Sequence, residues 1–131
     1  MNYFVFNKEL DYRRGYGEGG VWDADRLVLE EGRREGVFFS RVFDSQEAQT
    51  RWQRFVMDAE GRGTASILFT FYASDSLELA VSGRMARIPE LICDPDCPAA
   101  EKKRLLEPLK CREALFPRDI LLHEAKGRYL F

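Results

Sequence analysis

The sequence has few of the residues that a disulfide-rich, membrane-spanning or strongly charged protein needs. It contains three cysteines and one histidine in 131 residues. An odd and low number of cysteines does not suit a disulfide framework, so a reducing compartment is expected. Lysine and arginine number 20 against 22 acidic residues, and the net charge of −2 gives no general attraction to nucleic acid or anionic lipid. No apolar run approaches the roughly 18 residues of a membrane helix. Neither nucleic acid nor a membrane is therefore expected as a partner.

The beginning of the chain also lacks the features of a secretory signal. Residues 1–8 have no basic start, no long apolar stretch and no small-residue cleavage site. Hydrophobic residues make up 45% of the sequence and aromatic residues 13%, which is enough apolar material for a core and excludes a disordered chain. The length suits one domain, or one domain and a small appendage, with a single core.

Short apolar runs with alternating side chains predict a mostly β structure. The clearest run is 64–72, in which Ala65, Ile67, Phe69 and Phe71 would point to one side of a strand. Polar or glycine-rich segments between the runs are typical of turns. Further strands are predicted at 3–6, 37–44, 52–58, 120–123 and 128–131, while 77–86 is ambiguous. Residues 21–30 are predicted to form one or two extended segments, followed by a polar turn at 31–36.

A segment rich in helix formers interrupts the strands. Pro98 suits the first turn of a helix, where its missing N–H costs nothing, and 99–107 favours a helix. Pro108 then breaks or kinks the helix, and 109–115 is predicted to form one or two further helical turns. We interpret 93–115 as a helical insert.

Seven or eight short strands with regular turns predict an all-β fold, either an antiparallel sandwich or a barrel. We interpret it as an antiparallel β-sandwich of jelly-roll type in a single domain over 1–131. The helical segment does not recur between strands, which disfavours a βαβ architecture. The chain stops inside an apolar run at Leu130 and Phe131, as expected for a domain cut from a longer protein or a terminal strand tied into the sheet. In a domain cut from a longer protein, the strand ending at Phe131 would leave an exposed edge, through which we hypothesise association.

Three cysteines and the histidine are the candidates for a reactive or metal-binding group. Cys93 and Cys97, with three residues between them, could instead close a small disulfide loop. Cys93, Cys97, Cys111 and His123 could supply the four ligands of a structural zinc site, but their spacing matches no common zinc pattern. Buried or half-buried free thiols are favoured. Cys111 and His123 could also meet in space as nucleophile and base. A lone histidine on a strand is more often structural, so no catalytic residue and no metal are predicted.

Other polar groups are also candidates for binding or catalysis. Asp23 and Asp25 would share one strand face and could support calcium binding or acid–base work, but solvated loop charges are favoured. The glycine cluster at 15–20 lacks the strand–helix context and the Lys-Ser/Thr ending of a phosphate loop. The basic run at 102–104 indicates a solvated helix face. No cofactor is predicted.

Four aromatic residues define an alternative function. Flat aromatic faces stack on sugars, so exposed side chains could line a glycan-binding groove of a jelly-roll carbohydrate-binding module. Core packing explains the same residues equally well. The candidates are Tyr12, Tyr16, Trp22 and Trp52.

Five motifs follow one another in the chain: 39–45 (FSRVFDS), 50–54 (TRWQR), 63–75, 119–122 (DILL) and 125–131 (AKGRYLF). Taken in this order, they resemble a β-rich domain in phage-tail-like proteins of contractile injection systems. In that family the domain often lies near a tail-protein-I-type baseplate segment. The resemblance covers roughly 37–75 and 119–131, and 10–15 more faintly.

This resemblance implies a non-enzymatic structural module of a tail or baseplate. Its partners would be other tail or baseplate subunits, and its location a cytoplasmic assembly that becomes part of a virion-like or released particle. No catalytic residue is transferred from the family to this chain. The sequence departs from the family layout in two ways, since nothing follows Phe131 and 93–115 has the character of an insert.

Overall fold

A computed structural model describes residues 4–56, 67–115, 119–122 and 125–131. Most regular elements in this part of the chain are short strands in small antiparallel sheets, accompanied by few helices. The prediction of a mostly β fold is confirmed, whereas a single jelly-roll sandwich stays a prediction. The chain divides into two compact units. Unit 1 comprises 1–43, 77–105 and 131, and unit 2 comprises 44–76 and 106–130.

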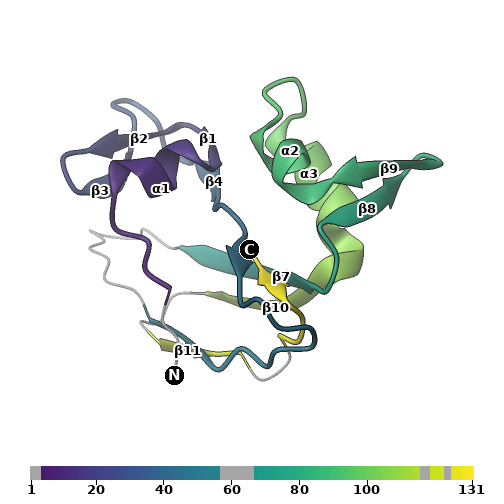
Figure 1. The fold of residues 1–131 in the computed structure, drawn as a ribbon. Coiled ribbons are helices and arrows are strands. Elements are labelled where there is room, and N and C mark those ends of the chain that lie inside the picture. The colour runs from purple at the N-terminus through teal and green to yellow at the C-terminus, as the bar shows by residue number, and fades with distance from the viewer. Residues whose placement is uncertain (1–3, 57–66, 116–118, 123–124) are drawn as a thin grey trace. The chain divides into compact units, whose positions relative to one another are not determined.

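The N-terminal part of unit 1 is a short helix with two antiparallel strand pairs (Figure 1). The extended segment predicted at 21–30 forms a hairpin, and the predicted turn at 31–36 follows it. Gly19 separates the first two strands with a φ of +78°, and a Cβ there would lie 2.8 Å from the carbonyl oxygen of Glu35. Only glycine suits this position. The elements are α1 (Glu9–Arg13), β1 (Tyr16–Glu18), β2 (Gly20–Asp23), β3 (Arg26–Leu29) and β4 (Val37–Phe39), with β1 pairing β4 and β2 pairing β3.

The prediction of a strand at 3–6 is wrong for residues 4–6, which are the part of this segment that the structure describes. Residues 4–6 belong to no strand, and the chain enters α1 soon afterwards. The Asp11 carboxylate accepts hydrogen bonds from the backbone N–H groups of Asn7 and Lys8, at 3.2 and 3.1 Å, and so caps the helix. The Phe6 ring packs edge-on against Phe38, with centroids 5.5 Å apart. The aromatic run therefore contributes to packing and not to a strand ladder.

The second part of unit 1 is a β-hairpin followed by two helices. The ambiguous segment 77–86 is resolved as this hairpin, and its turn contains Gly83 with a φ of +79°. The helix predicted at 99–107 is confirmed, whereas the helix that precedes it was not predicted. The elements are β8 (Glu78–Val81), β9 (Arg84–Arg87), α2 (Ile88–Cys93) and α3 (Ala99–Leu106).

A four-stranded sheet in the order β10-β7-β12-β5 and the strand pair β6–β11 belong to unit 2, except that Phe43, the first residue of β5, belongs to unit 1. The core cluster of unit 2 consists of Phe71, Leu122, Ala125 and Leu130. Phe69 and Phe71 alternate on one face of β7 as predicted, and both contact Phe55 with ring centroids 5.1 Å apart. The strands are β5 (Phe43–Asp44), β6 (Arg54–Val56), β7 (Leu68–Ser74), β10 (Lys110–Leu115), β11 (Asp119–Leu121) and β12 (Tyr129–Leu130).

The helical turns predicted at 109–115 are wrong. Pro108 lies in a 3-10 turn, η1 (Glu107–Leu109), and the chain then becomes strand β10, which pairs with β7. Proline cannot donate to a continuing helix, so the chain leaves the helix here. The register shifts next to Cys111, whose Sγ donates to the carbonyl oxygen of Phe71 at 3.2 Å. The helical part of the predicted insert at 93–115 therefore ends at Leu109.

The strand near the end of the chain is not at a sheet edge. β12 lies between β7 and β5, and pairs with Ser74 and Ala73 of β7. Its two residues are each only 8% exposed. The expectation of an exposed edge at this strand is therefore wrong, because β12 has a neighbour on both sides.

Candidate functional site

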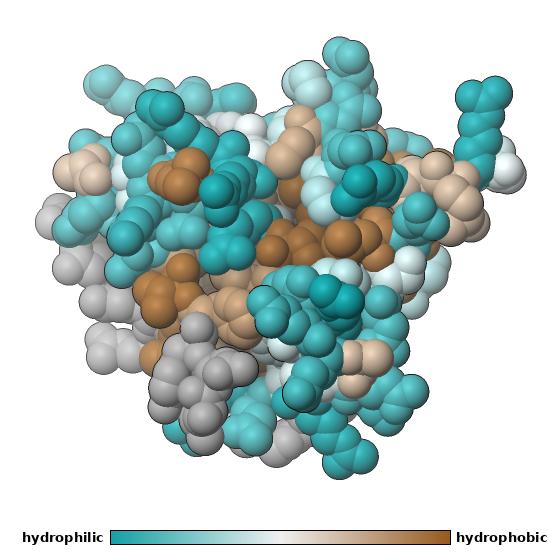
Figure 2. Space-filling model, viewed as in Figure 1, coloured by the Kyte–Doolittle hydropathy of each residue, from teal (hydrophilic) through white to brown (hydrophobic). Residues whose placement is uncertain are grey.

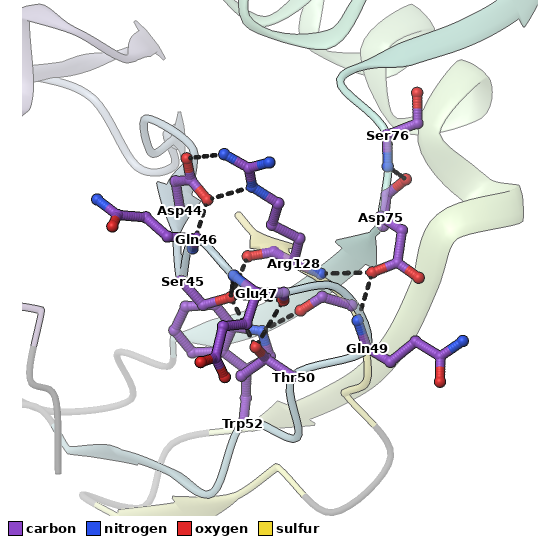
Figure 3. Close-up of polar contacts among 12 residues, drawn as sticks. Asp44, Ser45, Gln46, Glu47, Gln49, Thr50, Trp52, Asp75, Ser76 and Arg128 are labelled. Atoms are coloured by element: carbon purple, nitrogen blue, oxygen red, sulfur yellow. Dashed lines mark hydrogen bonds and ion pairs between the residues drawn. The ribbon is translucent and has the colours of Figure 1, made fainter.

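Several of the segments quoted for the proposed resemblance lie at least partly in unit 2, whereas 39–43 and 10–15 belong to unit 1. Residues 44–52, 73–76 and 125–130 lie next to one another, and their polar groups form one connected set (Figure 3). We call this set the motif network. It is defined by Asp44, Ser45, Gln46, Glu47, Gln49, Thr50, Trp52, Asp75, Gly127 and Arg128.

Arg128 is the centre of the motif network. Its guanidinium makes two hydrogen bonds to the Asp44 carboxylate, Nε to Oδ1 at 2.8 Å and Nη2 to Oδ2 at 3.0 Å. Its backbone N–H donates to Asp75 Oδ1 at 2.9 Å. Its carbonyl oxygen accepts from both the backbone N–H and the Oγ of Ser45, each at 2.9 Å. One residue thus joins β5 and the end of β7 to the start of β12.

The loop that follows β5 is held by its own side chains. The Ser45 and Thr50 hydroxyl oxygens are 2.7 Å apart, and the Thr50 hydroxyl also donates to the carbonyl oxygen of Glu47. Gln46 and Gln49 have positive φ values, 67° and 57°, which side-chain-bearing residues seldom adopt. Their backbone N–H groups are bound by Asp44 and Asp75, each at 2.7 Å. The hydrogen bonds fix a loop shape that the backbone alone disfavours.

Trp52 and Gly127 complete the motif network. The indole Nε1 of Trp52 donates to the carbonyl oxygen of Gly127 at 2.9 Å, while its ring packs against the core cluster of unit 2. The N–H of Gly127 donates to the carbonyl oxygen of Thr50 at 2.9 Å. A Cβ on Gly127 would lie 2.8 Å from the backbone of Ser74. Glycine allows the 125–128 segment to approach β7 this closely.

The charges of the motif network stabilise one another. The hydrogen bond from Arg128 is the largest influence on the Asp44 carboxyl and lowers its pKa, while the same contact raises the pKa of Arg128. Both groups are therefore ionised over the whole physiological range. A carboxylate with a lowered pKa is a poor proton donor at neutral pH, so this pair is suited to holding the loop and not to general acid catalysis.

Two of the four aromatic candidates for sugar stacking lie in one aromatic cluster of unit 1. The Tyr12 ring stacks on Trp22, with centroids 6.0 Å apart, and on Phe38, with centroids 5.5 Å apart. Phe6 contacts the same Trp22 and Phe38 rings. Both Tyr12 and Trp22 are half-buried. Much of their aromatic surface is thus occupied by neighbouring rings.

The other two candidates have different surroundings. Tyr16 packs on Phe39 and lies under the Lys102 ammonium, whose Nζ is 3.7 Å from the ring centroid. A hydrogen bond from its hydroxyl to Glu18 raises the pKa of Tyr16 to about 12. Trp52 belongs to unit 2 and to the motif network, as described above. The structure brings together Tyr12 and Trp22 but gives Tyr16 and Trp52 other partners.

A buried lysine in unit 1 was not predicted. Lys102 has no exposed surface, and its ammonium donates to the carbonyl oxygens of Asp94, at 2.6 Å, and Cys97. These carbonyl oxygens and the Tyr16 ring together take the place of water around the charge. The basic run at 102–104 had indicated a solvated face, and no spacing in the sequence separates Lys102 from its neighbours. The prediction is wrong for this residue.

The start of α3 is capped from β1. The Glu18 carboxylate accepts hydrogen bonds from the Tyr16 hydroxyl, at 2.7 Å, and from the backbone N–H of Ala99, at 3.1 Å. The hydrogen bond from Tyr16 makes the largest contribution to the lowered pKa of Glu18. An anion at a helix N-terminus is stabilising, so these contacts attach the helix to the strand.

The three cysteines differ in exposure. Cys93 is exposed, Cys97 is buried and Cys111 is half-buried at the β10 irregularity, while His123 lies outside the described residues. In the part of the chain that the structure describes, no three histidine, cysteine or acidic side chains are grouped so that they could hold a metal ion.

The acidic pair lies in the β2–β3 hairpin, where Asp23 ends β2 and Asp25 belongs to the turn. Both residues are exposed, and Asp25 is 3.4 Å from the Arg26 guanidinium. This arrangement agrees with solvated charges.

Comparisons with models of protein families, with curated proteins and with solved structures gave no match. Among the helices that the structure describes, none has the length and apolar character needed to cross a membrane.

Proposed function

We propose that this protein is a non-enzymatic structural module of a phage-tail-like or contractile injection assembly and acts through protein–protein contacts. Its partners are other tail or baseplate subunits in a cytoplasmic assembly, later part of a virion-like or released particle. The jelly-roll form of the sandwich belongs to the same proposal. The observation that supports it is the motif network, because the polar groups of the resembling segments bind one another and hold a loop against the sheet.

Exposed apolar side chains on several strands give additional support. Figure 2 shows hydrophobic surface interrupting the hydrophilic residues on the face it presents. In unit 1, Leu29 on β3 is 49% exposed and Met85 on β9 is 63% exposed. In unit 2, Val56 on β6 and Leu115 on β10 are exposed to a similar extent. Apolar side chains on short strands can contact a neighbouring subunit, and strand edges can pair with one.

A carbohydrate-binding module is the alternative proposal. It requires flat aromatic faces that a sugar can reach, and Trp22, like Tyr12, Tyr16 and Trp52, is half-buried, so part of its side chain is exposed. Its contacts with Tyr12 and Phe6 occupy part of the remainder. Glycan-array binding that disappears in Trp22→Ala would favour this alternative over the structural module.

The structural proposal is tested by affinity purification from the cell that encodes the chain. A tagged copy is expressed at native level, and co-purifying proteins are identified by mass spectrometry. Tail or baseplate subunits are expected with the wild-type chain and fewer of them with Leu27→Asp/Leu29→Asp, which places charge on exposed positions of β3. Arg26→Ala, also exposed on β3, is the control. Recovery of the folded chain without any such subunit would overturn the proposal.

A further inference from the structure

Unit 1 contains a recess that the motif network does not explain. It lies where the end of α1, the link between β4 and β5, and α2 meet, and its volume is about 360 Å³. Cavities of this size accommodate a small ligand or a few side chains of a peptide. The lining residues are Arg14, Arg41, Val42, Pro89, Ile92 and Cys93.

Half of the lining is apolar. Val42 and Pro89 present hydrocarbon surface, and Ile92 also lines the recess but is only 1% exposed and is a buried residue of α2. An apolar side chain seated here would be removed from water at a gain of roughly 25 cal/mol per Å² of buried apolar surface. A bare inorganic anion would gain nothing from this surface, because it needs several hydrogen-bond donors around it.

The rest of the lining carries a surplus of positive charge. Arg41 is held in place, because its Nε lies 3.1 Å from Asp11 Oδ1 and its guanidinium stacks 4.3 Å from the centroid of the Phe43 ring. Although partial burial alone would raise the pKa of Asp11, the hydrogen bonds from Arg41, Asn7 and Lys8 together lower it, so the carboxylate stays charged.

Asp11 therefore neutralises Arg41, and the charge of Arg14 remains. Within the described residues Arg14 makes no ion pair. The recess thus combines an apolar lining with one uncompensated guanidinium.

We propose that this recess binds an acidic peptide segment of a partner protein. One apolar side chain of the segment lies on Val42, Pro89 and Ile92, and a neighbouring carboxylate pairs with Arg14. This site would be one means by which the structural module contacts its partners. It depends on the proposed function in one respect only, that the partner is another protein. Its test uses the purified chain alone, so its failure is distinguishable from a failure to find assembly subunits.

Cys93 provides a reporter at the recess. Its thiol is exposed, and Sγ donates to the carbonyl oxygen of Arg14 at 3.2 Å. Dithiobis(nitrobenzoate) carries an aromatic ring and a carboxylate, whereas dithiodipyridine is an uncharged aromatic disulfide. In each reaction the Cys93 thiolate attacks one reagent sulfur, a mixed disulfide forms and one aromatic thiolate leaves. The rate ratio of the two reagents therefore measures recognition of the carboxylate, after the rate remaining in Cys93→Ser is subtracted.

Arg14→Ala should lower this ratio by roughly two- to fivefold, the effect of one solvent-accessible charge pair. Arg13→Ala is the matched control, because Arg13 is adjacent but is bonded to Glu9 at 3.0 Å and does not line the recess. An unchanged ratio in Arg14→Ala, or an equal loss in both variants, would overturn the proposal.

A second measurement uses peptides as competitors. Acetyl-Phe-Asp-amide at millimolar concentration should slow the labelling of Cys93 more than acetyl-Phe-Asn-amide does, and Arg14→Ala should abolish the difference. Inorganic phosphate and a short DNA oligonucleotide are tested in parallel. Protection by phosphate or DNA equal to that by the acidic peptide, or no difference between the two peptides, would contradict an acidic peptide site.

Discussion

Arg128 and Asp44 are 84 positions apart in the sequence, yet their side chains meet in a two-point ion pair with distances of 2.8 and 3.0 Å. The pair joins the end of β5 to the start of β12 and forms one side of the motif network (Figure 3). An arginine that binds a carboxylate through two parallel hydrogen bonds fixes geometry as well as charge. The pair therefore determines where the 45–50 loop lies in unit 2.

Replacing Arg128 should loosen that loop. In Arg128→Ala the side-chain contact to Asp44 is lost, and we expect faster amide hydrogen exchange at Ser45, Gln49 and Trp52. Arg128→Lys should give only partial rescue, because an ammonium cannot reproduce the two-point contact. Arg112→Ala, an exposed arginine on β10, is the matched control. Identical exchange in all three variants and the wild type would show that the pair does not hold the loop.

The Asp44 carboxylate should make stability depend on acid pH. The Arg128 hydrogen bond lowers its pKa in the folded protein below the ordinary value of 3.8. The unfolded chain then binds more protons than the folded chain below about pH 5, so the contribution is complete above that range and is lost as pH falls through the folded pKa. Urea unfolding between pH 7 and pH 2 should show that the free energy of unfolding falls less on acidification in Asp44→Asn than in the wild type. Asp23→Asn is the control, because it makes the same charge change in the exposed hairpin and should leave the pH dependence as in the wild type. Equal acid slopes for Asp44→Asn and wild type would be inconsistent with this linkage.

Gly127 should not tolerate a side chain. In Gly127→Ala the new Cβ would lie 2.8 Å from the backbone of Ser74, and β7 and the 125–128 segment must separate. A loss of about 1–3 kcal/mol in the free energy of unfolding is expected, as for other overpacked sites. In Gly17→Ala the new Cβ has its nearest neighbour at 3.4 Å, so little change is expected. Chemical denaturation of both variants checks the difference, and comparable stabilities would refute the close approach.

Lys102 should behave as a buried structural cation. Lys102→Met keeps the length of the side chain but leaves the Asp94 and Cys97 carbonyl oxygens without their donor, at a cost of about 1–3 kcal/mol each. Lys103→Met, on an exposed neighbour, should be close to neutral. Thermal and urea unfolding compare the two variants. If Lys102→Met is as stable as Lys103→Met, the ammonium is not needed by the 94–97 turn.

The part of the fold that follows from local pattern could be predicted from the sequence. Alternating apolar residues predicted strand β7, and the helix formers after Pro98 predicted helix α3. β10 was missed because Lys110–Leu115 contains good helix formers, and its pairing with β7 outweighs their intrinsic preference. α1 was missed because its capping depends on one carboxylate, Asp11.

The side-chain contacts of the candidate site could not be predicted from local pattern. The contact of Asp44 with Arg128 depends on the order of strands in the sheet, which spacing along the chain does not reveal. The burial of Lys102 depends on a turn that presents two carbonyl groups to it. A signal was nevertheless present in the first case, since Asp44, Asp75 and Arg128 each stand at or next to a strand end, where polar side chains can join neighbouring segments.

The most direct test of the central claim is the composition of the particles made by the cell that encodes this chain. Particles are sedimented, washed and analysed by quantitative mass spectrometry for this chain and for sheath and baseplate proteins. If the chain is a structural module, it will sediment with the particles at a fixed ratio to baseplate subunits. If the chain stays in the low-mass fraction while complete particles sediment without it, the account is contradicted.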